Sequence, residues 1–490
     1  MAFADQYVGH VSVARLVLQR GMALLYLLAF LTVKNQGKPL LGEHGLSPIP
    51  AFLQRVRFRD APSLFHWRYS DRLLDAVAWT GIVVAACAAL GLTEAGPIWL
   101  SVTAWLLLYV LYLSVQNVGQ RFFGFGWESM LLEAGFFTAF LGPTHIQPSV
   151  IPVLILRWML FRTELGAGLI KLRGDRVWKD LTALYYHYET QPLPNPLSWY
   201  FHRLPKASHR FGVIFSHFVQ VVVPFGLFGP QPVAAIAAAL CTFQQIWLIV
   251  SGNYSWLNWL TALLGIAGFS DEVLQHVLPL HLSAVAAPMP PALHGLLYLL
   301  AVAVAALSVQ PVLNLLSRQQ KMNYSYNRYH LVNSYGAFGT VGKERFEIVL
   351  EGTRDSVLTP ATQWQEYGFK AKPGDVYRRP PQIAPYHLRL DWMIWFLPFS
   401  VQVLPRGIYV SGHELWFVRL IQKLLRNDAS TLGLMGHNPF SEAPPTHIRA
   451  LFYWYRYTDP QTKRSTGAWW TRELLGTYLP PVTLQHLREF

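Results

Sequence analysis

Long apolar segments dominate the first 313 residues of this chain and restrict it to one class of fold. A helix of about 20 apolar residues spans the hydrocarbon core of a bilayer, and most of these segments are near that length. They lie at about residues 13–33, 76–92, 97–115, 127–142, 149–172, 211–228, 233–251, 256–269 and 292–313. We therefore expect a polytopic α-helical membrane protein with eight or nine spans.

The composition agrees with a membrane protein. Of the 490 residues, 52% are hydrophobic and only 14% are charged, which is unusual for a soluble enzyme of this size. The net charge of +13 is compatible with nucleic acid as a partner, but the basic residues lie among Trp, Tyr and Pro and form no nucleic-acid motif. We predict membrane lipids as partners and no nucleic acid. The two cysteines, Cys87 and Cys241, fall in apolar segments and indicate no disulfide framework.

The chain divides into two predicted domains. Residues 1–316 are expected to form the multi-pass domain, with long polar loops at 34–75 and 173–210. The first loop holds the basic cluster Arg55, Arg57 and Arg59, which is typical of a segment at anionic headgroups. Residues 317–490 lack an apolar segment long enough to span the bilayer, so we predict that they form an extramembrane domain.

We predict that this C-terminal domain is β-rich, because apolar and polar residues alternate in several of its segments. Segments 346–352, 364–373 and 447–458 have the pattern of strands. In the last of these, Ile448 and Phe452 would lie on one face and Leu451 and Tyr455 on the other. A helix is expected around 414–426.

The fifth apolar segment carries charged residues. Arg157, Glu164 and Lys171 are seven residues apart, so on a helix they share one face, with Arg162 close by. Charge in hydrocarbon is costly unless it is paired or faces water, so the first interpretation is a buried ionic cluster. Alternatively, Arg157 and Lys171 lie at opposite ends of the span and snorkel to the two membrane surfaces.

Acidic and amide side chains in neighbouring segments supply partners for this cluster. Glu133 is the better candidate for a buried partner of Arg157, Arg162 or Lys171, whereas Glu128 is expected at the membrane interface. Amides in lipid commonly join helices. Here they are Gln220, Gln244, Gln245, Asn253 and Asn258.

A conspicuous polar motif follows the charged segment. Its residues of interest are Arg173, Asp175, His187, Glu189 and Thr190. Four prolines restrict the loop that carries them, and its aromatic side chains need cover, so we expect it to be ordered and pressed against the C-terminal domain. The spacing of His187 and Glu189 indicates a hydrogen-bonded loop more than a metal site. No P-loop, GxSxG, HExxH or CxxC motif occurs, and we predict neither metal nor cofactor.

Several runs resemble one known family. These are LFRTELGAGLIKLRGD, LTALYYHYETQPLPNPLSWYFHRLP, FKAKPGDVYRRPPQIAPYHLRLDWMIWF and YLPPV, and the similarity extends from about Arg121 to the C-terminus. Together they are similar to the lipase maturation factors. The resemblance implies a multi-pass protein of the endoplasmic reticulum membrane whose animal relatives help certain dimeric lipases reach an active fold. We expect a bacterial-type member, because recognisable eukaryotic sorting signals and cysteines in the hydrophilic regions are lacking.

Three functions compete at this point. The resemblance favours a chaperone-like maturation factor for extracytoplasmic clients such as lipases. More distantly, GAGLIKL followed by Trp resembles vitamin K-dependent carboxylase relatives, which would make Lys171 the general base of an integral-membrane enzyme. A transporter would require repeated, broken helices, and no convincing internal repeat is present. Whether any reaction is catalysed stays open, with a non-enzymatic role favoured.

Topology is the last prediction from the sequence. With nine spans, both long loops and the C-terminal domain share one side, which carries most of the loop Lys and Arg. The positive-inside rule then assigns that side to the cytoplasm. The resemblance implies the opposite, and the rule is weaker for long loops and domains. We predict an integral protein of the bacterial inner membrane, or of the endoplasmic reticulum membrane in a eukaryote, with an extracytoplasmic C-terminal domain.

Overall fold

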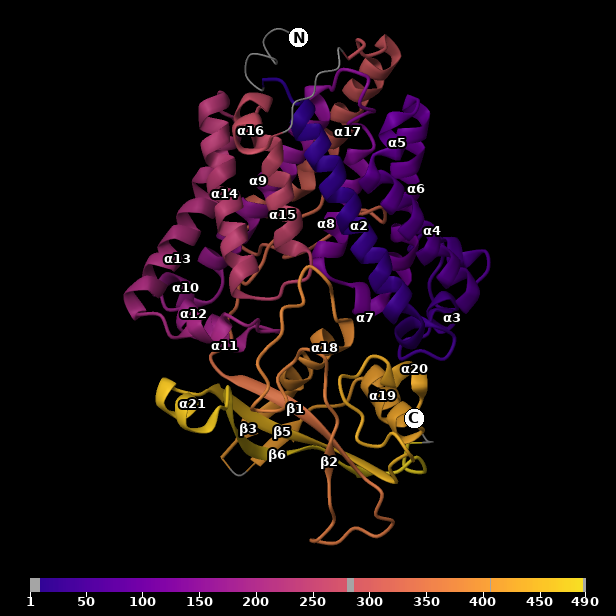
Figure 1. Cartoon of the computed structure of the whole chain (residues 1–490), viewed down its shortest axis with the longest axis vertical. Helices are drawn as coiled ribbons and strands as arrows, with labels where there is room; N and C mark the ends of the chain where they lie inside the picture. The colour runs from indigo at the N-terminus through magenta and orange to yellow at the C-terminus, as the bar shows by residue number, and fades with distance from the viewer. Residues whose placement is uncertain (1–8, 280–285, 406, 488–490) are drawn as a thin grey trace.

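The computed structural model describes residues 9–279, 286–405 and 407–487, and it contains a helical bundle followed by a domain with β-sheets (Figure 1). Within those ranges, six helices are long and apolar enough to cross a membrane. They are α2 (Ser12–Leu41), α4 (Asp71–Leu90), α6 (Ile98–Val118), α13 (Lys206–Val221) with the 3-10 turn η2 (Val223–Phe228), α14 (Gln231–Ser251) and α17 (Pro291–Leu316). The chain is therefore a multispan helical membrane protein in its first 300 or so residues.

Three further helices correspond to the other predicted segments. They are α8 (Gly126–Thr138), α9 (Val150–Arg173) and α15 (Leu257–Gly265), the last extended by the turn η3 (Ile266–Gly268). The helices α8 and α15 are shorter than a bilayer core, and α9 carries several charges, so none of the three qualifies as a span by length and composition. The count of eight or nine spans is thus not established by the helices alone.

Short helices close the two ends of the bundle. They are α3 (Ile49–Leu53), η1 (Leu64–His66), α5 (Leu92–Ala95), α7 (Gln120–Phe123), α10 (Arg176–Lys179), α11 (Leu184–Thr190), α12 (Ser198–His202) and α16 (Asp271–Val277). At the end remote from the C-terminal domain, the Asp271 carboxylate accepts hydrogen bonds of 2.8 Å from the backbone N–H groups of Ser12 and Val13. This satisfies donors that the start of α2 leaves without a helical partner.

Helix α2 is long enough to join the bundle to the C-terminal domain. Its 30 residues extend about 45 Å, which exceeds the bilayer core. Near its end, Gln36 donates from Nε2 to the carbonyl of His387 at 2.6 Å and accepts from the N–H of Arg389 at 2.9 Å. The helix thus reaches a segment located some 350 residues later.

The C-terminal domain is built on a four-stranded antiparallel sheet with the order β2-β1-β5-β6. The strands are β1 (Arg345–Thr353), β2 (Gln365–Glu366), β5 (His447–Tyr457) and β6 (Trp470–Val482), and a separate hairpin joins β3 (Val401–Leu404) to β4 (Gly407–Val410). Its helices are α18 (Arg389–Ile394), η4 (Leu397–Ser400), α19 (Leu415–Leu425), α20 (Ala429–Leu432) and α21 (Pro460–Thr466). In the centre, Ile348 pairs with Phe452.

The predicted strands and helix of this domain are confirmed where the sequence pattern is strongest. The strand expected at 447–458 is β5, the one at 346–352 is β1, and the helix expected near 414–426 is α19. Only two residues of 364–373 form a strand, β2. Strand β6 was not predicted, because a glycine and two prolines interrupt its pattern and it pairs with β5 through irregular register.

Both faces of β5 are covered. Ile448, Ala450 and Phe452 join the main hydrophobic core, which continues from the bundle into this domain. On the opposite face, Tyr455 and Tyr457 pack with Trp199, Trp470 and neighbouring aromatics. Because Trp199 comes from α12, the loop between α9 and α13 supplies part of the cover of the sheet.

Candidate functional site

Helix α9 brings four charged side chains into the centre of the bundle. Arg157, Arg162, Glu164 and Lys171 are each at most 4% exposed. The surrounding helices are α8, α13, α15 and α17. Protein therefore encloses all four charges, and Arg157 and Lys171 do not extend to the two membrane surfaces as the snorkelling alternative requires.

An amide relay connects Glu164 to Lys171. Lys171 Nζ donates to Gln220 Oε1 at 2.6 Å, and Gln220 Nε2 donates to Glu164 Oε2 at 3.1 Å. Gln245 Nε2 donates to the other Glu164 oxygen at 2.7 Å, and Asn258 donates to Gln245 Oε1, also at 2.7 Å. Side chains from α9, α13, α14 and α15 thus form one polar chain, in which the acid and the cation are bridged by an amide.

The carboxylate of Glu133 binds Arg162. The two form a buried ion pair between α8 and α9. Asn333 donates to Glu133 Oε2 from its backbone N at 2.8 Å and its Nδ2 at 2.9 Å, and the Tyr335 hydroxyl donates at 2.7 Å. Of the three basic residues considered as partners, Arg162 is the one that Glu133 contacts. The other two partners of Glu133, Asn333 and Tyr335, come from the segment after α17.

Arg157 lies apart from these acids. It donates from Nε to the carbonyl of Ala267 and from Nη1 to that of Leu227 at 3.4 Å. Among the described residues, no carboxylate forms an ion pair with it. Its guanidinium instead joins the two 3-10 turns η2 and η3.

Glu128 is buried in protein, contrary to its expected place at the membrane interface. Its Oε1 lies 2.8 Å from Nη1 of Arg389 in α18, and both side chains are inaccessible to solvent. Tyr112 donates its hydroxyl to the same carboxylate. The ion pair crosses the junction between the bundle and the C-terminal domain.

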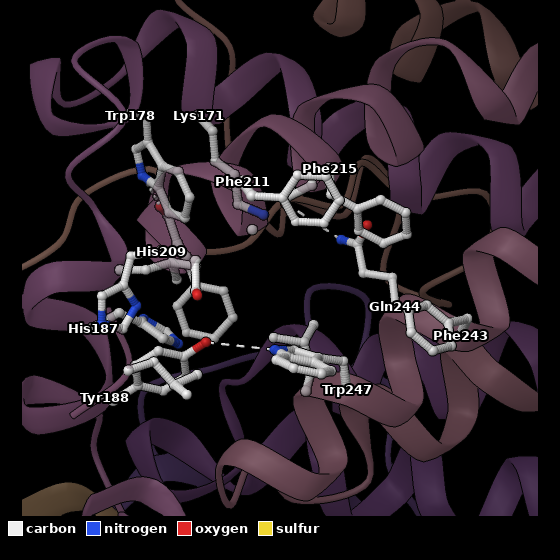
Figure 2. A pocket seen from close by; sticks show the side chains of 17 residues that line it. Lys171, Trp178, His187, Tyr188, His209, Phe211, Phe215, Phe243, Gln244 and Trp247 are labelled. Carbon is white, nitrogen blue, oxygen red and sulfur yellow. Dashed lines mark hydrogen bonds between the residues drawn. The ribbon is translucent and has the colours of Figure 1, made fainter. Parts of the chain in front are cut away.

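A cavity of 490 Å³ opens beside Lys171 (Figure 2). Its walls come from α13 and α14, the end of α9 and the loop helices α10 and α11. They are mainly apolar and aromatic, with Phe211, Phe215, Phe243 and Trp247 on the side of α13 and α14. The Lys171 ammonium lies 4.9 Å from the centre of the Trp178 ring.

The loop motif has two faces. His187 Nε2 lies 2.8 Å from the hydroxyl of Tyr254, a residue between α14 and α15, and this hydroxyl donates to Gln191 Oε1 at 2.5 Å. Two residues later, the Glu189 carboxylate accepts from the backbone N–H of Tyr457 in β5 at 2.6 Å. Helix α11 thus binds the bundle with one side and the sheet with the other.

Burial governs ionisation in this loop. It lowers the pKa of His187 to about 4, and the nearby Lys171 charge acts in the same direction. Burial also raises the pKa of Glu189, while the hydrogen bond from Tyr457 and nearby arginines oppose the rise. The imidazole of His187 is therefore neutral near pH 7.

The other motif residues have local partners. Arg173 Nη1 donates to Gln320 Oε1 at 2.8 Å, and Asp175 accepts from the N–H of Val177 at the start of α10. Thr190 donates to the carbonyl of Tyr186, one turn earlier. Among the described residues, no group of three or more His, Cys, Asp or Glu side chains could hold a metal ion.

A second, more open cavity of 600 Å³ lies between the bundle and the C-terminal domain. Its aromatic wall includes Trp392, Trp395, Phe396 and Phe399. A glycine-containing segment, 336–342, also lines this cavity. His187 and Phe338 line both cavities and so form the partition between them.

Sequence comparisons match both parts of this architecture. The model of the lipase maturation factor transmembrane domain matches residues 13–276, and that of the lipase maturation factor C-terminal domain matches residues 331–480. The chain belongs to the lipase maturation factor family. Both family regions are present, and the ion pair between Glu128 and Arg389 joins them.

Curated members of the lipase maturation factor family align along almost the whole chain. Lipase maturation factor 1 of Homo sapiens is 39% identical over 99% of this chain and 91% of its own length. The Bos taurus protein of the same name is 39% identical, covering 97% and 90%. Lipase maturation factor 2 of Homo sapiens is 27% identical, covering 95% and 82%. No solved structure matches the chain.

These relatives correct one expectation and leave another without support. They are vertebrate proteins, so the prediction of a bacterial-type member is wrong. Nothing in the comparisons favours the carboxylase-like enzyme, in which Lys171 would be the base.

Sequence reasoning missed several residues that this lipase maturation factor family member uses at its domain junction. Arg389, Asn333 and Tyr335 lie outside the apolar segments, and nothing local distinguishes them from surface residues. Arg345, Glu347 and Lys372 form another buried ionic group, with Lys372 Nζ 2.7 Å from Glu347. The position of Glu347, directly before the apolar residues Ile348, Val349 and Leu350 of β1, is the signal that could have indicated this ionic group.

Proposed function

We propose that this protein is a membrane-embedded maturation factor for lipases. The observation that carries the proposal is the family match of both regions, together with relatives named lipase maturation factor 1 that align over nine-tenths of their own length. The role is chaperone-like: the protein binds a secretory lipase during folding and releases it in active form.

Nine passes through the membrane follow if α8, α9 and α15 are added to the six apolar helices. Support comes from the direction of the nine helices, which alternate along the chain between the two ends of the bundle (Figure 1). Helix α9 has 24 residues, about 36 Å, and keeps its charges inside the bundle. The membrane domain then comprises residues 1–316 and the C-terminal domain residues 317–490.

The C-terminal domain faces the lumen of the endoplasmic reticulum in this proposal, because a secretory client folds there. With nine passes, the loops 34–75 and 173–210 lie on the same side. A glycosylation acceptor tag fused after Phe490 should be modified, whereas the same tag within 270–291 should not. The reverse pattern would place the domain in the cytoplasm and remove its access to the client.

Membrane lipids are the second class of partner. Arg55, Arg57 and Arg59 are exposed in the loop after α3, next to Phe58, which is 47% exposed. Basic side chains beside an exposed aromatic suit a surface of anionic headgroups. This loop would rest on the membrane at the side of the C-terminal domain.

The client surface is an apolar patch on the C-terminal domain. We define it by large side chains that are each at least 39% exposed: Phe396, Phe399, Val403, Leu404, Tyr409 and Leu474. The first two also line the 600 Å³ cavity, so the patch continues into a groove. An exposed apolar surface of this kind matches a lipase whose own core or dimer interface is still uncovered.

The loop motif holds this surface in position. Arg345 donates to the carbonyls of Glu189 and Gln191 at 2.9 and 2.6 Å, and Glu189 binds Tyr457. The ionic residues of the bundle serve the same purpose from the membrane side. In this role Glu133, Arg157, Arg162, Glu164 and Lys171 fix α9, and the motif residues Arg173, Asp175, His187, Glu189 and Thr190 connect α9 to the sheet.

Co-expression with a secreted dimeric lipase tests the proposal. Phe399→Asp and Tyr409→Asp should lower the yield of active lipase while the abundance of the maturation factor is unchanged. Val357→Asp is the matched control, because Val357 is 72% exposed but lies in the connection between β1 and β2, outside the patch. Equal lipase activity with all three variants would exclude the patch as the client surface, and equal activity without the protein would exclude the function.

A further inference from the structure

The cavity beside Lys171 has the features of a ligand site that the maturation role does not use. Its 490 Å³ is within the range of small-molecule sites, about 300–1,000 Å³. Of the seventeen described residues that line it, Lys171 is the one lysine or arginine, and no carboxylate is among them. One buried cation thus faces a mainly apolar space.

The apolar wall is continuous with the lipid-facing surface of the bundle. Phe211 on α13 is 68% exposed, and Phe243 and Trp247 on α14 are also exposed. Both helices are candidate membrane spans, so large apolar side chains on their outer surface contact hydrocarbon. Phe211, Phe243 and Trp247 also line the cavity, so a hydrocarbon chain can enter between them from the bilayer without passing through water.

The ammonium group of Lys171 can still bind an anion. Gln220 accepts one of the three N–H donors of Lys171, and Trp178 contacts the ammonium through its ring. Among the described residues, no direct ion pair joins Glu164 to the ammonium: Gln220 bridges the two groups, and Gln245 donates to the other carboxylate oxygen. The ammonium is thus only partly compensated, and a bound anion would offset the cost of its burial.

A second polar group in the cavity points to the same ligand. Gln244 is 5% exposed, and its Oε1 is buried with no hydrogen-bond partner among the described residues. Its Nε2 makes a long contact of 3.4 Å with Ser216 Oγ. Gln244 lines the cavity, and the two orientations of an amide are nearly equivalent in shape, so the unpartnered position can hold an N–H donor for an anion as well as the oxygen.

We propose that this cavity binds a single-chain anionic amphiphile, with its alkyl chain between α13 and α14 and its headgroup at Lys171. The headgroup chemistry is a carboxylate or a phosphate monoester, which a lysine recognises as a point charge. A free fatty acid and a lysophosphatidate are the two sources of this chemistry. Neutral lipids have no anionic group for Lys171, and the volume of 490 Å³ is that of a small-molecule site.

The direct test uses the purified full-length protein in non-ionic detergent. A photoactivatable diazirine analogue of palmitate is cross-linked and its site mapped by mass spectrometry, with the methyl ester of the same probe in parallel. The acid should label peptides of α11, α13 and α14, and the ester should label them about tenfold less. Equal labelling by acid and ester, or labelling elsewhere only, would overturn the proposal.

Two substitutions and a competition complete the test. Lys171→Met should weaken palmitate binding about tenfold, whereas Lys206→Met, which changes an exposed lysine on α13 outside the cavity, should not. If Lys171→Met fails to fold, the comparison of acid with ester in the unaltered protein still decides. Competition by unlabelled palmitate or by lysophosphatidate identifies the source, and competition by neither overturns the proposal. The result is independent of lipase activation.

Discussion

Arg389 of α18 places its Nη1 2.8 Å from Oε1 of Glu128 in α8, and both side chains are fully buried. The arginine also donates to the carbonyl of Phe122 at 2.6 Å, and its guanidinium lies 3.5 Å from the centre of the Phe123 ring. The C-terminal domain therefore inserts a charged side chain into the base of the helical bundle. The two family regions fold against each other rather than as tethered independent units.

Removing one member of this ion pair should prevent correct assembly. Glu128→Gln or Arg389→Met leaves a buried charge without its partner, at a cost of about 3–5 kcal/mol. The double variant should recover part of that loss, because no charge is left alone. Thermal unfolding of the purified variants in detergent measures this, and a double variant less stable than both single variants would contradict the pairing.

Gly166 should not tolerate a side chain. A Cβ there would lie 2.2 Å from the backbone oxygen of Tyr335, in the segment that also binds Glu133. Gly166→Ala is expected to destabilise the protein by several kcal/mol or to abolish its accumulation. Gly295→Ala in α17 is the matched control, because nothing lies within 4 Å of that Cβ, and it should be neutral or stabilising by about 0.5–1 kcal/mol. Similar abundance of the two variants would contradict this packing.

Asn253 should be irreplaceable at the junction. Its Oδ1 accepts from the N–H groups of Ile383 and Ala384 at 2.8 and 2.9 Å, and its Nδ2 donates to the carbonyl of Pro381 at 2.9 Å. Asn253→Ala leaves these groups without partners, each at a cost of about 1–3 kcal/mol. Limited proteolysis between the domains should become faster, whereas Gln363→Ala, which changes an exposed amide in the connection between β1 and β2, should behave as the unaltered protein.

Acid should destabilise the protein through His187. Burial lowers the pKa of His187 to about 4, below the value near 6.5 of an unfolded chain. Between these values the unfolded state binds more protons, so the contribution of His187 to stability is constant above about pH 6.5 and falls as the pH decreases towards 4, by about 3 kcal/mol in all. Unfolding at a series of pH values measures this slope. His187→Gln should reduce the slope, and substitution of the exposed His44 should not.

The sequence by itself determined which segments are apolar helices and which residues of α9 are out of place in lipid. Both depend on local patterns: the length of an apolar run and the spacing of charges on one helix. For the same reason β5, with its strict alternation, was predictable from residues 447–458. The solvation cost of charge makes a buried cluster of the charged residues of α9 the first interpretation, but it leaves snorkelling of Arg157 and Lys171 open, and only their burial in the structure decides between the two.

Only the tertiary structure decided which partner each charge has. Glu133 pairs with Arg162 across 29 positions, and Glu128 pairs with Arg389 across 261. Many basic residues could satisfy either acid, and chain separation carries no information about which one does. The same holds for β6, whose irregular register is fixed by pairing with β5, and for the cavity beside Lys171, whose walls come from α9, α13, α14 and the loop around His187. Such features depend on the packing of distant segments, which no local pattern encodes.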